Sequence, residues 1–251
     1  MKKFSLARIT VAGLVAVVSG IALANLLSGC SQTVESKSGV AEEMKNGQLP
    51  PAASQFFGNN ASLLHPGKEG QAALVYINPD AQWSKYTKIM LQPVQYWDKT
   101  DSKESIEDEQ KLVTYFHNQL QQTLQKNFTM VGQPGPDVLV LYVALINATT
   151  ATPVLRSISV VVPQARLLNS VQSLATGSYA FVGSAEAEMK AVDGGTGEFL
   201  AGAIDQRSGG IALSTAAQWQ WGDAENAMNY WSERINTRLL ELQGRTPAPA
   251  Q

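Results

Sequence analysis

Four acidic side chains in the second half of the chain could perform acid–base chemistry. They are Glu186, Glu188, Asp193 and Asp205. Paired carboxylates act as acid and base, or as acid and nucleophile, in most glycoside hydrolases. The two glutamates, however, alternate with small apolar residues, which is the pattern of a strand with one solvated face. We therefore expect them on a solvated strand face, and a glycan or peptidoglycan hydrolase that uses these carboxylates is the alternative.

Metal and nucleophilic chemistry have few candidate residues. The chain has two histidines, His65 and His117, and one cysteine, whereas a zinc site of usual composition needs more such ligands or a carboxylate cluster. No G-x-S-x-G elbow presents a serine nucleophile. The glycine-rich run 194–197 joins two expected strands and opens no helix, so it lacks the helix start that phosphate-binding loops need. The sequence predicts no metal, no cofactor and no enzymatic activity.

Two pairs of residues are candidates for recognition. Asp205 and Arg207 are two positions apart, hence on one side of a strand. They can pair with each other, which we favour, or bind the charge of a partner. Trp219 and Trp221 precede the last expected helix. Exposed tryptophans there would form a surface for a glycan or a protein, but we expect at least one of them to be buried.

The only cysteine, Cys30, ends the run Leu27-Ser28-Gly29-Cys30. Three basic residues stand near the start of the chain, and residues 9–27 are apolar or small without a charge. This is the three-part layout of a secretory signal, and its end is similar to the lipobox of bacterial lipoproteins. We expect cleavage between Gly29 and Cys30 and acylation of Cys30. The alternative is an uncleaved transmembrane anchor, because the apolar stretch is nearly long enough to span a bilayer.

Acylation of Cys30 would attach the protein to a membrane without electrostatic attraction between the protein and anionic lipids. Two or more acyl chains hold a protein stably at a bilayer. Loss of residues 1–29 removes three basic and no acidic residues, which leaves 16 basic and 21 acidic residues and a net charge of −5. Such a chain is a poor ligand for nucleic acid or anionic lipid. Ser31, in place of the aspartate that often retains lipoproteins in the inner membrane, favours the outer membrane.

The expected organisation has four parts. Residues 1–29 are a lipoprotein signal peptide, and residues 30–53 are the lipidated cysteine and a flexible tether rich in Ser, Gly, Lys, Glu and Pro. Residues 54–243 form a single α+β domain in the periplasm. Residues 244–251 are a disordered polar tail.

Hydrophobic periodicity predicts the elements of that domain. Helices are expected at 107–126, with Ser105 as N-cap, and at 223–242, with Asp223 as N-cap. Strands are expected at 74–77, 88–96, 137–146, 158–162, 179–191 and 199–205, the last two as a hairpin around the turn 193–197. The fold class is α+β, a mostly antiparallel sheet with two main amphipathic helices packed on one face.

The order and spacing of several short motifs also make most of the chain, roughly residues 55–243, similar to a known family. The motifs are Tyr76-Ile77-Asn78-Pro79, Trp83-Ser84-Lys85-Tyr86, Gln92-Pro93-Val94, Phe181-Val182-Gly183, Gly197-Glu198, Asp205-Gln206-Arg207-Ser208-Gly209-Gly210 and the closing helix with Trp231. They resemble the DUF3313 family of bacterial, mostly proteobacterial, lipoproteins without an assigned function. The resemblance implies a periplasmic α+β domain and supplies no catalytic residues.

These observations lead to one expected function and two alternatives. We expect an outer-membrane lipoprotein whose periplasmic domain is a non-enzymatic accessory or binding protein. Its partners would be the lipid bilayer, through acylated Cys30, and an envelope protein or peptidoglycan, but no nucleic acid. The alternatives are the carboxylate hydrolase and a carrier that holds a small apolar ligand between the sheet and its helices.

Substitution Cys30→Ala tests the predicted lipid anchor. We expect the variant to lose labelling by a palmitate analogue and to accumulate uncleaved, because the acylated thiol and the cleavage site are both gone. Metabolic labelling followed by electrophoresis measures both effects. A variant that is still labelled and cleaved like the unaltered protein would show that Cys30 is not the lipidation site.

Overall fold

The computed structural model describes residues 33–35, 49, 51–97, 105–149, 184–209 and 221–246. In chain order, the elements are β1 (Thr33–Glu35), α2 (Pro51–Phe57), the 3-10 helix η1 (Gly58–Leu63), β2 (His65–Pro66), β3 (Leu74–Ile77), the 3-10 helix η2 (Trp83–Lys85), β4 (Lys88–Leu91), β5 (Gln95–Trp97), α3 (Ile106–Leu124), β6 (Thr129–Met130), β7 (Val138–Thr149), β8 (Ser184–Asp193), β9 (Phe199–Gly209) and α7 (Gly222–Leu242).

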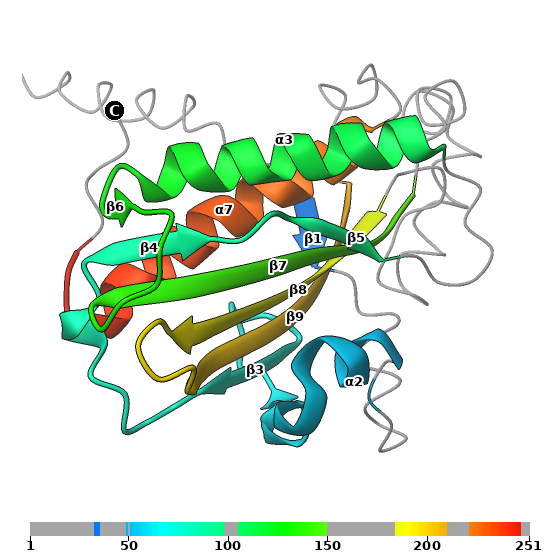
Figure 1. Cartoon of the computed structure of the whole chain (residues 1–251). Coiled ribbons are helices and arrows are strands. Elements are labelled where there is room, and N and C mark those ends of the chain that lie inside the picture. The colour runs from blue at the N-terminus through cyan, green and yellow to red at the C-terminus, as the bar shows by residue number, and fades with distance from the viewer. Residues whose placement is uncertain are drawn as a thin grey trace, which may run out of the picture. The chain divides into compact units, whose positions relative to one another are not determined.

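All described strands belong to one sheet, which is mixed (Figure 1). Its order is β2-β3-β9-β8-β7-β4-β6, while β1 also pairs with β9 and β5 also pairs with β7. β4 and β5 run parallel to β7, and β6 runs parallel to β4. The reason is α3, which carries the chain from β5 back to the start of β7, a crossover that joins parallel strands. Among the described strands, five pairs are antiparallel and three are parallel. The sheet is therefore mostly antiparallel, as expected, but it is mixed, and the sequence interpretation did not predict its parallel pairs.

The structure contains the predicted hairpin, formed by β8 and β9, and the predicted buried central strand, β7. β8 pairs along its length with both β7 and β9, and Ala187 lies opposite Asp205. The turn between the hairpin strands includes Gly197 with φ of 76°, a left-handed conformation that glycine adopts without strain. β7 is almost entirely buried, as its dense valine and leucine content predicted.

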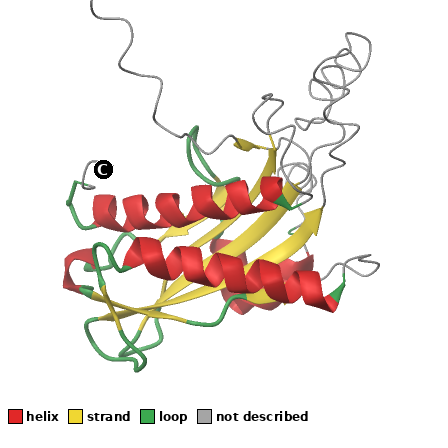
Figure 2. Ribbon diagram, turned by 90° about the horizontal axis from the view of Figure 1, so that it is seen from above, coloured by secondary structure: helices red, strands yellow, loops and turns green. Residues whose placement is uncertain are grey.

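The two long helices pack on one face of the sheet, as expected (Figure 2). Ser105 caps α3, since its side chain accepts a hydrogen bond from the Asp108 amide at 3.1 Å. The rings of Phe116 from α3 and Trp231 from α7 lie 5.9 Å apart. The predicted N-cap of α7 is wrong by two residues, because Trp221 holds that position and Asp223 lies in the first turn.

A smaller layer, formed by α2 and η1, covers the opposite face of β9 and its neighbours (Figure 1). Phe56 and Phe57 pack there against Leu74, Ile204 and other apolar side chains. Lys190 of β8 donates to the Phe56 carbonyl at 2.5 Å, which ties the layer to the sheet. Both faces of the hairpin are thus covered within the described part of the chain.

Three sequence boundaries need correction. The expected strand 88–96 is divided into β4 and β5 around Pro93, which has no amide hydrogen for a ladder bond. Part of the predicted tether is ordered structure, because Thr33–Glu35 pairs with residues 207–209 of β9 and α2 begins at Pro51.

Several predictions fall outside the described residues. They are the expected strand 158–162, residues 179–183 of the expected hairpin, the predicted signal peptide with Cys30, and residues 247–251 of the tail.

None of the helices among the described residues combines the length and the apolar character that a membrane crossing requires.

Gly202 tests the packing of the α2 layer on the sheet. A Cβ at this position would lie 2.8 Å from Phe199 Cζ and 2.9 Å from Phe57 Cε1. We expect Gly202→Ala to lower the free energy of unfolding by about 1–3 kcal/mol, because an overpacked core must shift its side chains. Urea denaturation measures the effect.

Gly132→Ala is the matched control, since a Cβ there would meet nothing within 4 Å. We expect it to change stability by less than about 0.5 kcal/mol, as most surface substitutions do. Equal stability losses in the two variants would contradict the described contact between the layers.

Candidate functional site

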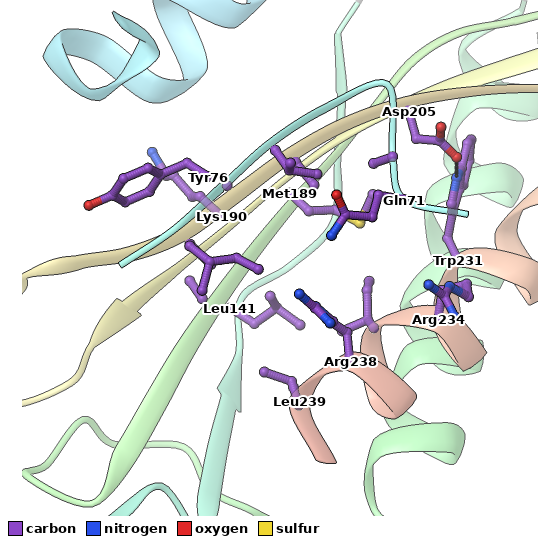
Figure 3. A pocket seen from close by; sticks show the side chains of 18 of the residues that line it. Gln71, Tyr76, Leu141, Met189, Lys190, Asp205, Trp231, Arg234, Arg238 and Leu239 are labelled. Carbon is purple, nitrogen blue, oxygen red and sulfur yellow. Dashed lines mark hydrogen bonds between the residues drawn. The ribbon is translucent and has the colours of Figure 1, made fainter. Parts of the chain in front are cut away.

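An apolar cleft lies between α7 and the strands β3, β9 and β8 of the sheet (Figure 3). Its volume is about 150 Å³. Most of the lining is aliphatic, and both walls contribute to it. The sheet supplies Val75, Ile77 and Met189, and α7 supplies Ile235 and Leu239. Because its walls are a helix and paired strands, the cleft is preformed, as ligand sites usually are.

Short side chains on the sheet explain why this space is not filled. Ala191, Ala201 and Ala203 line the cleft from neighbouring strands β8 and β9. Protein interiors normally pack as closely as organic crystals. A row of alanines under a helix that carries Ile235 and Leu239 leaves volume that the larger residues do not reach.

The ion pair of Asp205 and Arg207 forms one end of the cleft. Asp205 Oδ2 accepts from Arg207 Nε and from Trp231 Nε1, both at 2.8 Å, and its Oδ1 accepts from the Ala73 amide at 3.3 Å. Arg207 also donates to the Tyr230 hydroxyl at 2.8 Å and stacks over that ring. Both charged side chains are buried. The pairing favoured from the sequence is confirmed.

Two arginines and a glutamine supply polar groups elsewhere on the cleft. Arg234 Nη2 donates to the Gly70 carbonyl at 2.8 Å, which ties α7 to the loop before β3. Arg238 Nη1 donates to Glu241 Oε2 at 2.9 Å, and its side chain is 41% exposed. Gln71 extends from the loop and Arg238 from α7, on opposite sides of the cleft (Figure 3). Arg238 is therefore far more open to solvent than Arg207, whose side chain is 8% exposed.

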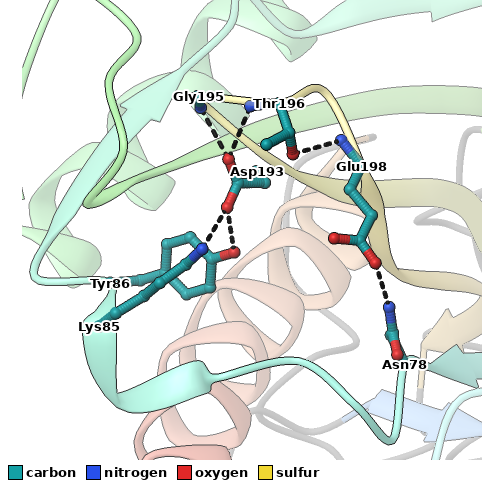
Figure 4. A network of polar contacts seen from close by, with 7 residues as sticks. All are labelled: Asn78, Lys85, Tyr86, Asp193, Gly195, Thr196 and Glu198. Atoms are coloured by element: carbon teal, nitrogen blue, oxygen red, sulfur yellow. Dashed lines mark hydrogen bonds and ion pairs between the residues drawn. The ribbon is translucent and has the colours of Figure 1, made fainter.

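A second polar cluster closes the far end of the hairpin (Figure 4). Asp193 Oδ2 accepts from Lys85 Nζ at 2.6 Å and from the Tyr86 hydroxyl at 2.7 Å. Its Oδ1 accepts from the amides of Gly195 and Thr196 at 2.7 and 2.8 Å. The carboxylate thus joins the β8–β9 turn to η2 and the residue that follows it.

These contacts shift the pKa values of the acidic groups in opposite directions. Burial alone would raise the pKa of Asp193, but the hydrogen bonds from Lys85, Tyr86 and the turn amides outweigh it and hold that pKa below its usual range. Burial and the bond to Asp193 raise the pKa of Tyr86 to about 12. At neutral pH the cluster is an ionised carboxylate held by neutral and cationic donors, which suits a structural clamp.

The carboxylates expected on a solvated strand face lie elsewhere. Glu186 and Glu188 are buried, with 3% and 0% exposure, so that expectation is wrong. The reason is the second covered face, on which they share the side of Ala144 and Ile204. Asp205 points to the opposite face, toward α7, since its carboxylate bonds to Trp231.

Asp193 is also remote from the two glutamates. It lies five residues beyond Glu188 on β8, a distance of about 17 Å along a strand. The fold therefore does not bring Asp193 or Asp205 to the same site as Glu186 and Glu188. The two glutamates are themselves closed off from solvent, so these four carboxylates do not form the accessible pair that glycoside hydrolysis requires.

The remaining candidate residues are dispersed. Trp221 is buried, with 1% exposure, and Trp219 lies outside the described residues, as do Gly29 and Cys30. His65 is exposed in β2 and His117 is half-buried on α3. Across the described residues, no three His, Cys, Asp or Glu side chains gather as a metal site would require.

Sequence reasoning gave an apolar ligand between the sheet and its helices as one alternative, but it did not identify the residues that line the cleft or its arginines. The available signals were the alanines that alternate along β8 and β9 and the spacing of Arg234 and Arg238, one helical turn apart on α7. Neither signal indicates a cavity until the helix is placed over those strands.

Fold and cleft together define a mixed α/β domain with a preformed apolar cleft under its last helix. The chain belongs to the DUF3313 family, described as a protein of unknown function, whose model matches residues 52–235. No curated protein matches the chain.

Several solved structures are similar to the chain. The PelC dodecamer from Paraburkholderia phytofirmans has 9% identity and a TM-score of 0.36 over 63% of this chain and 96% of that one. The hypothetical protein CT253 from Chlamydia trachomatis has 9% identity and a TM-score of 0.31 over 62% and 96%. A DUF4136 family protein from Bacteroides thetaiotaomicron has 12% identity and a TM-score of 0.29 over 64% and 95%.

The Asp193 cluster predicts a specific response to acid. A carboxyl group whose folded pKa is depressed contributes stability above its unfolded pKa and loses it as pH falls toward the folded value. We expect wild-type stability to decline below about pH 4, since the ordinary value is 3.8. Asp193→Asn should be less stable by about 1–3 kcal/mol at pH 7, as for loss of charge-assisted hydrogen bonds, and less sensitive to acid.

Asp137→Asn serves as the control for this measurement. Asp137 pairs with Lys88 at 2.8 Å, but both side chains are 42% exposed, and exposed pairs add little stability. We expect its urea unfolding curves at pH 7 and pH 3.5 to follow those of the wild type. An Asp193→Asn variant with the wild-type acid response would refute the clamp.

Proposed function

We propose that the protein is an outer-membrane lipoprotein whose periplasmic domain is a non-enzymatic binding protein. Its ligand is a small amphiphile that places an aliphatic chain in the cleft beneath α7 and an anionic group beside Arg238. The single observation that carries this proposal is the preformed, mostly aliphatic cleft with an arginine on its open side. The membrane part of the proposal is supported by the signal-like N-terminus that ends at Cys30.

The volume of the cleft sets the size of the ligand. An apolar cavity of about 150 Å³ in another protein stays dry and binds benzene. A cleft of about 150 Å³ therefore holds an apolar group at least as large as benzene, and its open side leaves room for a longer aliphatic chain such as that of octanoate. Burial of that chain supplies the affinity, because each methylene removed from water contributes about 0.8 kcal/mol.

The anionic group follows from the charges that line the cleft. Asp205 and Arg207 neutralise each other, and the Lys190 ammonium is directed to the α2 layer. Arg234 and Arg238 remain on the α7 wall. A guanidinium has five N–H donors, and Arg238 uses one of them for Glu241 in an exposed pair. Such a pair contributes little, so a ligand carboxylate can take its place at low cost.

Octan-1-ol and octanoate test the two parts of the ligand separately. We expect both to bind and octanoate to bind more tightly, as measured by titration calorimetry. Ala203→Leu should weaken binding of both by at least about tenfold, since the added side chain occupies the space of the ligand chain. Arg238→Gln should weaken octanoate about tenfold through loss of a charge-assisted hydrogen bond and leave octan-1-ol unchanged.

Two variants away from the cleft are the controls. Asn118→Leu adds the same apolar side chain on the exposed side of α3, and Arg245→Gln removes an arginine that packs over Phe128. We expect both to bind like the wild type. Failure of both ligands to bind the wild type would contradict the binding function. Equal binding of both ligands, with no effect of Arg238→Gln, would contradict only the anionic group.

A further inference from the structure

The pairing of β1 with β9 leaves a very short connection between the sheet and the predicted lipid anchor. Only Ser31 and Gln32 lie between Cys30 and Thr33, the first residue of β1. The three steps from Cys30 to Thr33 span at most about 11 Å even when fully extended. A chain anchored at Cys30 therefore cannot search widely from the membrane, in contrast to a domain on a tether of about 23 residues with a reach of about 25–30 Å.

The register of β1 determines which end of the sheet is connected to Cys30. Thr33 lies opposite Gly209 and Glu35 lies opposite Arg207, so the chain enters the sheet at the Gly209 end of β9. The other end of β9 begins at Phe199, after the hairpin turn. About ten residue steps separate the two ends, a distance of about 33 Å.

The Gly209 end of the sheet also carries apolar side chains at the surface. Among the described residues, Ile106 has the most exposed large apolar side chain, with 85% exposure. Ile106 begins α3 at this end, and β5 also ends there, at the half-buried Trp97 (Figure 1). Apolar and aromatic residues are favoured at a membrane–water interface.

Charge does not account for attachment at this end. The first turn of α3 carries Glu107, Asp108 and Glu109. Lys111 pairs with Glu107 at 2.9 Å and with Asp108 at 3.7 Å, which leaves the turn acidic. Acidic side chains are not attracted to anionic lipids. The short covalent connection is thus what would bring this end to the bilayer.

We propose that the end of the sheet at Gly209, with the start of α3, faces the bilayer, and that the hairpin turn at 194–197 points away from it. The partner is a phospholipid surface, and the connection through β1 sets the orientation. This inference rests on the acylation of Cys30 in the proposed function, and it is independent of the ligand in the cleft.

Depth-dependent fluorescence quenching of the lipidated protein tests the orientation. Glu107→Cys places a label at the start of α3, and Gln133→Cys places one in the exposed loop before β7, whose first residues pair with the end of β8 at Asp193. Acylated Cys30 has no thiol, so each label is unique. In phosphatidylcholine vesicles with a spin-labelled lipid, we expect the label at 107 to be quenched at least about twofold more than the one at 133, given the length of the strands.

Insertion of a Gly-Ser segment between Gln32 and Thr33 tests the role of the connection. About twelve such residues add a reach of about 20 Å, and we expect quenching at position 107 to fall toward that at 133. Equal or reversed quenching without the insertion would overturn the orientation, and quenching unaffected by the insertion would overturn the connection as its cause. Labelling of the same preparation by a palmitate analogue separates these outcomes from absence of the lipid anchor.

Discussion

The buried carboxylate of Asp205 is the constraint on which the arrangement around the cleft depends. A buried charge is costly unless hydrogen bonds satisfy it, and here the donors come from three elements, Arg207 on β9, Trp231 on α7 and Ala73 before β3. All three donors are in place only when α7 and the start of β3 are both seated on β9. Removal of one partner from a buried pair typically costs about 3–5 kcal/mol, so the position of α7 is strongly specified.

The cleft is a consequence of that position. α7 is held over strands whose side chains at this point are short, such as Ala201 and Ala203, and the resulting space cannot be closed by a shift of the helix without breaking the contacts of Asp205. The Asp193 clamp restrains the other end of the hairpin in the same way, through Lys85 and Tyr86. A site between two restrained walls binds a ligand without a large cost of reorganisation.

Because both faces of the hairpin are covered, polar residues lie in a buried environment on either face. On a sheet with one solvated face, Glu186 and Glu188 would be surface groups. Here α2 and η1 occupy the second face, and the glutamates are buried on it, while Asp205 lies on the other. Asp205 and the buried glutamates therefore cannot act together on one bond, as paired catalytic carboxylates must.

Local patterns determined most of the elements, because they depend on residues close together in the chain. Helical spacing and the Ser105 cap predicted α3, alternation around a glycine turn predicted the hairpin, and a spacing of two placed Asp205 beside Arg207. The lipobox-like run likewise predicts acylation of Cys30 from neighbouring residues alone. Burial of Glu186, pairing of β1 with β9, the mixed sheet and the cleft were decided only by the tertiary structure. Each of them depends on contacts between segments far apart in the sequence, whose free energy no local pattern contains.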